Sequence, residues 1–162
     1  MVLKAIREHR ATRVFKGEAV PDETMRTILS AGRRAQSSKN SQPWQFIVVR
    51  ERVTLRQLGE CGRWAGHLAG AAFGVALVTT ARDSFDLGQA AAYLMLAAHE
   101  LGVASCLAAM WDEDKAKAIL GIPAENTFHY AISFGYAAGD QPVPGVARGR
   151  KPLEDVVRWE KW

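Results

Sequence analysis

The loop at residues 36–43 carries side chains whose types suit ligand binding. It reads Gln-Ser-Ser-Lys-Asn-Ser-Gln-Pro and connects a basic, helical-looking segment with an apolar run at 46–49. Its small hydroxyls, amides and backbone N–H groups can hydrogen-bond a planar ligand with polar edges. Pro43 favours an extended backbone at Gln42, and Trp44 is expected to anchor the loop to the core. The same composition also suits an ordinary connection between a helix and a strand.

Basic residues near the two ends of the chain could bind an anion. Arg10 and Arg13 are spaced so that both guanidinium groups could reach one small anion. A second basic group follows much later, at Arg148, Arg150 and Lys151. The two groups could meet around one anion. They could equally be solvated surface, and arginines near a helix C-terminus are favoured by the helix dipole alone.

Several other kinds of site are not indicated. No Gly-x-Gly-x-x-Gly fingerprint opens a helix after a strand, and no Walker A loop is present. The two cysteines do not form a Cys-x-x-Cys pair and the four histidines are scattered, so no metal site is expected. Cys106 lies in an apolar run and is interpreted as a small buried hydrophobe. His67 is interpreted as a surface or packed histidine.

Length and charge place the chain among ordinary globular proteins. Its 162 residues are expected to form one domain, 1–162, and 48% of them are hydrophobic. A formal charge of +4 that is not massed in one block argues against a dedicated nucleic-acid binder. The N-terminus shows no signal peptide, and the apolar runs are too short to span a bilayer. A cytoplasmic protein without membrane contact is expected.

Hydrophobic periodicity predicts alternating helices and strands. Strands are predicted at 46–49, 73–79, 103–110 and 129–136. Helical segments are predicted at 3–9, 21–35, 53–58, 61–72, 86–101 and 112–120. This mixture indicates an α+β domain in which helices flank a sheet.

Two segments are predicted to make extensive contacts. The helix at 86–101 has a wide apolar stripe and many alanines, which suits close packing in the body of the protein or at a subunit interface. The tail after residue 140 contains several prolines and glycines and ends in Trp159 and Trp162. Because exposed indoles are unfavourable in water, the tail is expected to pack on something.

Taken in order, several stretches resemble the nitroreductase family of flavin oxidoreductases over nearly the whole chain. They are His9-Arg10-Ala11-Thr12-Arg13-Val14-Phe15, the run from Ser37 to Trp44, Asp86–Ala90 with Leu101–Cys106, Leu120–Pro123, and Arg150–Val156. The chain departs from the family pattern where Gln36 stands for a proline, Ala11 for a serine and His9 for an arginine. It is also short between 79 and 86, where larger members insert helical material, so a more open active site is expected.

The resemblance implies a nitroreductase-like α+β fold with a central mixed sheet and an intertwined homodimer. It further implies two FMN molecules at the subunit interface, with the loop from one subunit and the N-terminal basic residues from the other. The matching cofactor-binding positions are His9, Arg10, Ala11, Arg13, Ser37, Ser38, Asn40, Leu107, Ala108, Arg148, Arg150 and Lys151. No catalytic side chain is required, because the flavin carries the hydride chemistry.

The function implied by the resemblance is FMN-dependent transfer of hydride from NAD(P)H to a small-molecule acceptor. The acceptor would be a nitroaromatic, a quinone or a similar compound, reduced in a ping-pong cycle. Three alternatives remain at this point. They are a specialised flavin enzyme, a non-catalytic flavin-binding protein of the same fold, and a basic interaction domain without a cofactor.

Overall fold

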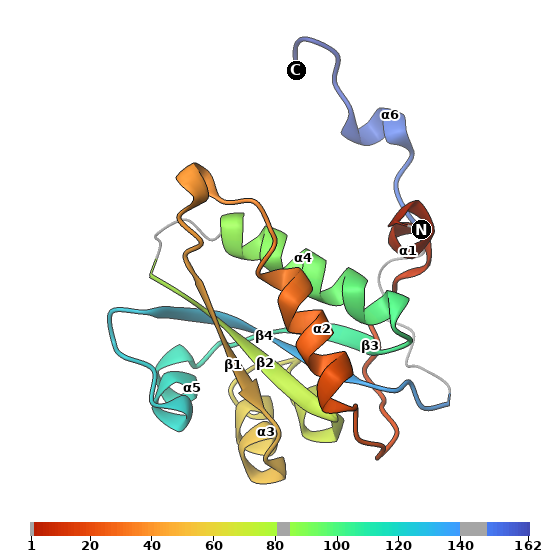
Figure 1. The fold of residues 1–162 in the computed structure, drawn as a ribbon. Helices are drawn as coiled ribbons and strands as arrows, with labels where there is room; N and C mark the ends of the chain where they lie inside the picture. The colour runs from red at the N-terminus through yellow and green to blue at the C-terminus, as the bar shows by residue number, and fades with distance from the viewer. Residues whose placement is uncertain (1, 81–84, 140–148) are drawn as a thin grey trace.

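A computed structural model of the 162-residue chain describes residues 2–80, 85–139 and 149–162. The strands are β1 (Trp44–Val49), β2 (Phe73–Thr79), β3 (Ala104–Ala109) and β4 (Thr127–Gly135). The α-helices are α1 (Val2–Glu8), α2 (Asp22–Gly32), α3 (Arg52–Gly59), α4 (Phe85–Glu100), α5 (Glu113–Leu120) and α6 (Leu153–Val156). Two short 3-10 helices, η1 (Ser38–Asn40) and η2 (Gly66–Gly70), complete the described elements (Figure 1).

The four strands form one sheet in the order β1-β2-β4-β3. All three pairings are antiparallel, so the prediction of a mixed sheet is wrong for the described strands. The physical reason lies in the path of the chain. Helix α4 connects β2 to β3, and these two strands run in the same direction. They are not neighbours, however, because β4 lies between them and pairs antiparallel with both.

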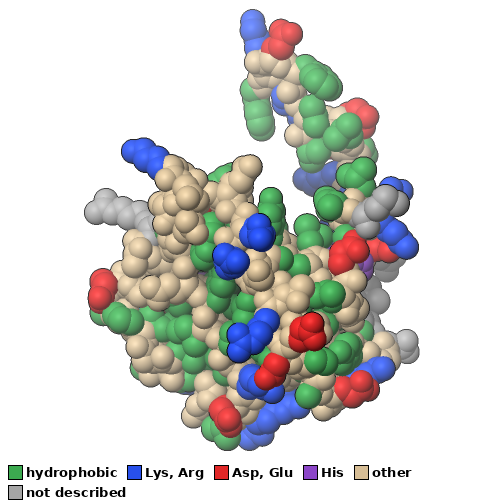
Figure 2. Space-filling view, viewed as in Figure 1, with side chains coloured by type: hydrophobic (Ala, Val, Ile, Leu, Met, Phe, Trp, Pro, Cys, Tyr) green, Lys and Arg blue, Asp and Glu red, His purple; other side chains and the backbone are tan. Residues whose placement is uncertain are grey.

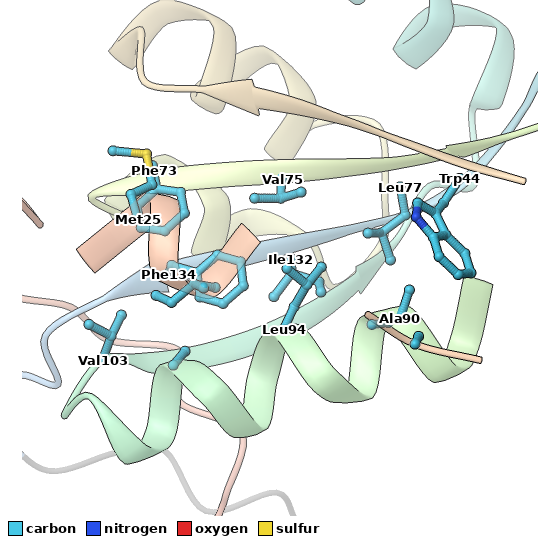
Figure 3. Close-up of a cluster of buried hydrophobic side chains, with 14 of the residues drawn as sticks. Met25, Trp44, Phe73, Val75, Leu77, Ala90, Leu94, Val103, Ile132 and Phe134 are labelled. Atoms are coloured by element: carbon cyan, nitrogen blue, oxygen red, sulfur yellow. The ribbon is translucent and has the colours of Figure 1, made fainter. Parts of the chain in front are cut away.

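Helices cover both faces of the sheet. On one face, α2 and α4 pack on Phe73, Val75 and Leu77 of β2, and the rings of Phe73 and Phe134 stack with centroids 4.8 Å apart. Figure 3 shows Trp44, Leu77 and Ala90 together at the beginning of α4, with Val103 and Phe134 farther along the helix. On the other face, α3, η2 and α5 pack on a second buried cluster. The anchoring of Trp44 in the core is confirmed.

Local sequence signals explain most element boundaries. The strand at 73–79 has the predicted limits. At the start of α5, the Asp112 side chain caps the helix by accepting the Lys115 N–H at 3.1 Å. Gly121, with φ 65°, ends that helix in the left-handed conformation that glycine tolerates best. The second helix is shorter than predicted and ends at Gly32. Of the predicted helical segment 61–72, only η2 is helical.

The C-terminal segment 149–162 stands clear of the sheet (Figure 1). Trp159 and Trp162 are 85% and 103% exposed, so the surface on which the tail was predicted to pack is not provided by their own chain. Figure 2 shows hydrophobic side chains along this segment. None of the helices in the described part of the chain is long and apolar enough to cross a membrane.

Candidate functional site at the outer edge of β3

Strand β3 is an edge strand, and its outer edge gathers several of the predicted site residues. The N–H of Met110, directly after the strand, donates to the carbonyl of His129 in β4 at 2.8 Å. Because strand backbone groups alternate in direction, Ser105, Leu107 and Ala109 turn their N–H and C=O groups outward. Three separate segments of the chain cover the three outward carbonyls.

The N-terminal segment covers the first of them. The N–H of Thr12 donates to the carbonyl of Ser105 at 2.9 Å, and Ala11 forms a parallel bridge with Ser105. This bridge holds the segment that carries the predicted basic residues alongside β3. Within it, Arg10 donates from Nη1 to the carbonyls of Arg7 and His9, both at 2.7 Å, and its side chain is exposed.

His67 covers the second outward carbonyl. Its side chain is 9% exposed and hydrogen-bonds to the carbonyl of Leu107. Its Nδ1 lies 2.8 Å from Oγ of Ser133. The Ser133 hydroxyl donates to the carbonyl of Cys106 at 3.2 Å, so Ser133 links the imidazole to the backbone of β3. Burial lowers the pKa of His67 to about 4, with a further contribution from the positive charge of Arg13, which keeps the ring neutral.

The segment 61–64 covers the third carbonyl. A Cβ atom on Gly62 would lie 2.1 Å from the carbonyl oxygen of Ala109, so only glycine allows this approach. The carbonyl of Cys61 accepts the N–H groups of Trp111 and Asp112 at 2.8 and 2.9 Å. The backbone at the end of β3 is therefore firmly tied to the chain that follows α3.

Arg13 brings a positive charge to this edge. Its positive charge interacts electrostatically with both His67 and Cys106, two buried groups at the middle of β3. Burial raises the pKa of the Cys106 thiol, and Arg13 opposes that shift. Cys106 is 3% exposed, which confirms that it is a buried residue. The Leu107 side chain is 43% exposed, whereas Ala108 is buried and its backbone groups face Ala131 of β4, so the predicted contact of Ala108 with a ligand at this edge is not supported.

His9 lies near the beginning of the same strand. Its Nε2 is 3.3 Å from Oγ of Ser105, and its ring meets that of His99 edge to face with centroids 5.8 Å apart. Burial lowers the pKa of His9, and the charges of His99 and Arg10 lower it further. His9 is therefore held against the C-terminal end of α4.

The loop 36–43 lies at the other end of α4. The N–H of Ser38 donates to Oδ2 of Asp86 at 3.0 Å, and Nε2 of Gln89 donates to the carbonyl of Gln36 at 3.3 Å. Lys39, Asn40 and Gln42 all have positive φ, of 53°, 55° and 48°. The prediction of an extended Gln42 is therefore wrong, because its N–H turns back to donate to Oγ of Ser37 at 2.9 Å.

One chain therefore brings only part of the predicted site together. His9, Ala11, Arg13, Leu107 and Ala108 gather at β3, whereas Ser37, Ser38 and Asn40 belong to the distant loop (Figure 1). The contacts at Asp86 and His99 are separated by roughly 20 Å, at about 1.5 Å per helical residue. Arg150 and Lys151 are exposed in the C-terminal segment, and Arg148 lies outside the described residues.

His67 and Ser133 complete the β3 edge. Of the two alternatives expected for His67, the packed histidine is confirmed, and Ser133 was not predicted to have a role. A serine alternating with apolar residues in a predicted strand is a weak signal of a buried hydrogen bond. The register places Ser133 opposite Cys106, and its contact with His67 shows that the Ser133 hydroxyl faces η2. Within the described ranges, no group of three or more His, Cys, Asp or Glu residues could hold a metal ion.

The residues at β3 fit one end of a flavin nucleotide. A flavin ring has polar edges and apolar faces, and its nucleotide phosphate is an anion. Outward N–H groups of β3, the half-exposed Leu107 and the charge of Arg13 supply a matching set of partners. The exposed hydroxyls and amide of the loop offer a second set, but they lie too far along α4 to join the first within one chain.

Comparisons with known proteins show which family the sequence is similar to. The sequence model of the nitroreductase family matches residues 6–74 and 71–136. The chain is 30% identical over 172 residues to an assigned NADH dehydrogenase/NAD(P)H nitroreductase of Archaeoglobus fulgidus, covering 99% of this chain and 98% of that protein. It is 28% identical to a nitroreductase of Mycolicibacterium smegmatis, covering 98% of this chain and 92% of the relative.

Solved structures show the same fold at lower identity. An FMN-dependent nitroreductase of Clostridium difficile superposes with a TM-score of 0.86 at 23% identity, covering 99% of both chains. An NADPH:FMN oxidoreductase of Vibrio harveyi, complexed with NAD+, superposes with a TM-score of 0.88 at 20% identity. That match covers 99% of this chain and 77% of the other.

Proposed function

The chain belongs to the nitroreductase family, and from that membership we propose that it is an FMN-dependent oxidoreductase that uses NAD(P)H to reduce a small organic acceptor. The acceptor would be a nitroaromatic, a quinone or a similar compound. For a nitro group, the net two-electron reaction converts the nitro compound, NAD(P)H and a proton into the nitroso compound, NAD(P)+ and water. FMN, when bound, supplies the hydride transfer in a ping-pong cycle.

The single observation that carries this proposal is the outer edge of β3. Outward N–H groups at Leu107 and Ala109 would hydrogen-bond the polar edge of the flavin ring, and the exposed Leu107 side chain would lie against its face. Arg13 would stabilise negative charge on the reduced ring, since a fixed cation stabilises charge that develops nearby. His9, Arg10, Arg148, Arg150 and Lys151 would contribute polar and positive groups for the phosphate.

A homodimer would bring together the two groups of site residues that lie apart in one chain. Ser37, Ser38 and Asn40 of one copy would complete the site formed at β3 of the other. The exposed apolar surface supports such an assembly. Val2, Leu3 and Ile6 of α1 are 68%, 73% and 55% exposed, and a cavity of about 380 Å³ between α1, α2 and α4 is lined mainly by apolar side chains.

The proposal is tested by the visible absorption spectrum of the purified protein without oxygen, before and after addition of NADH or NADPH. A flavin spectrum that bleaches supports a reductase, and reoxidation by a nitroaromatic or a quinone identifies the acceptor class. A flavin that stays oxidised favours a binding protein or a specialised enzyme. A protein that is colourless and takes up no added FMN contradicts the proposal.

A further inference from the structure

A second cluster lies beside the end of β3, on the side of the sheet covered by α3 and α5. It forms a cavity of about 470 Å³ lined by Glu60, Cys61, Gly62, Arg63, Trp111 and Asp112. It is a shallow hollow that is wide open to solvent. We refer to these six residues together with Trp64 as the tryptophan pocket. None of its residues has a role in the proposed cofactor site.

Two indoles and one guanidinium dominate the tryptophan pocket. Trp64 and Trp111 are 74% and 65% exposed. The guanidinium carbon of Arg63 lies 5.3 Å from the centroid of the Trp64 ring and 5.8 Å from that of Trp111. Both distances are within the range of cation–π attraction, so both rings attract the same positive charge.

The charges around the pocket leave Arg63 as the group that can receive a ligand. Glu60 pairs with Lys115 at 3.6 Å, and Asp112 accepts the backbone N–H of the same lysine. No carboxylate in the described part of the chain pairs with Arg63. A ligand with a negative or strongly polarised oxygen would therefore find an available guanidinium between aromatic surfaces.

The pocket is also held in place and close to the proposed flavin position. The carbonyl of Cys61 accepts two backbone N–H groups from 111–112, and Gly62 packs on the carbonyl of Ala109. Aromatic groups fixed on a rigid backbone lose little conformational entropy when a ligand binds. Ala109 ends the strand whose outer edge would hold FMN, so a ligand in the pocket would lie next to the flavin.

We propose that the tryptophan pocket binds the electron acceptor as a planar aromatic compound, with a carboxylate or nitro oxygen directed at Arg63. This inference rests on the proposed function, because it assigns the acceptor to a surface beside the flavin. A second copy of the chain is a less suitable occupant. The large apolar surface for that contact lies on α1 and α4, which are on the other side of the sheet.

The first test measures binding without turnover, by calorimetric titration of the FMN-loaded protein with benzoate. Benzoate has the ring and the charge but cannot be reduced. Arg63→Gln should weaken its binding about tenfold, and Trp64→Leu and Trp111→Leu about three- to tenfold each. Arg56→Gln is the matched control, because Arg56 is an exposed arginine on α3 outside the pocket, and it should bind like the parent.

The second test separates the pocket from the proposed function. Steady-state KM for 4-nitrobenzoate should rise in the three pocket variants by the same factors, whereas turnover with ferricyanide, which is not aromatic, should stay within about twofold of the parent. An unchanged KM for 4-nitrobenzoate alongside normal ferricyanide turnover contradicts the pocket alone. A parent enzyme that reduces neither acceptor contradicts the proposed function.

Two further results would overturn the inference. One is a parent protein that does not bind benzoate. The other is a pocket variant that becomes monomeric in sedimentation while the Arg56→Gln control stays dimeric, because the indoles would then be a subunit contact.

Discussion

At the scale of single residues, positive charge and hydrogen bonding converge on the middle of β3. The charge of Arg13 acts on His67 and Cys106, and His67 joins the carbonyl of Leu107 to the hydroxyl of Ser133. The sequence predicted Arg13 through its spacing from Arg10. It did not predict His67 or Ser133, because their roles arise from strand register and from the approach of η2, which are tertiary features.

Replacement of Arg13 by alanine should weaken FMN binding more than it weakens the fold. A charge-assisted hydrogen bond contributes roughly 1.5–3 kcal/mol, so FMN affinity should fall by about ten- to a hundredfold. Equilibrium dialysis with FMN measures this, and thermal unfolding of the FMN-free protein controls for stability. Arg13→Lys should lose less, because it keeps the charge. Unchanged FMN retention in Arg13→Ala would contradict the assigned role.

His67 should make stability depend on pH in the acidic range. Its pKa is lowered from 6.5 to about 4 in the folded protein, so the unfolded chain takes up a proton between these values and the folded chain does not. Stability is therefore complete above pH 6.5 and decreases towards pH 4, by up to about 3 kcal/mol. Urea unfolding across this range should show a shallower decrease in His67→Gln.

At the scale of elements, hydrophobic periodicity predicted the order of helices and strands well. The strand at 73–79 and the long helix near 86–101 were found because each shows a strong pattern over many residues. The pairing order was not predictable in the same way. Whether β4 lies between β2 and β3 depends on long-range contacts, and periodicity within one strand carries no information about its neighbours.

The contact between the segment after α3 and β3 should be intolerant of any side chain at Gly62. Gly62→Ala places a Cβ against the carbonyl oxygen of Ala109, and such overpacking costs about 1–3 kcal/mol or more. Gly66→Ala is the matched control, since no atom lies within 4 Å of its added Cβ. Chemical denaturation should show Gly62→Ala clearly less stable and Gly66→Ala within roughly 0.5 kcal/mol of the parent. Equal stabilities would mean that the segment can shift away.

At the scale of the whole molecule, the isolated chain exposes more apolar surface than a monomer would favour. The C-terminal segment contributes Leu153, Val156, Trp159 and Trp162, which are all exposed. The sequence predicted that this tail must pack on something. Trp162 has Arg158 over its ring at 5.6 Å, but both indoles remain largely exposed, so a second copy is the simplest place for the tail to pack.

Deletion of residues 152–162 should therefore weaken the proposed homodimer. Sedimentation velocity over a range of protein concentrations measures the dissociation constant, and circular dichroism checks that each subunit still folds. A variant with Trp159 and Trp162 both replaced by serine should move the dissociation constant in the same direction. A truncated protein that stays dimeric at the lowest concentration would show that the tail is not in the interface.

The separation of the two groups of residues at opposite ends of α4 has a genetic consequence. If each site takes Arg13 from one chain and Asn40 from the other, defects at these two positions should complement each other. In a mixed dimer of Arg13→Ala and Asn40→Ala chains, one site would carry both defects and the other would carry neither. Co-expressing two inactive chains should then restore a functional site, whereas one chain carrying both substitutions, paired with itself, should restore none.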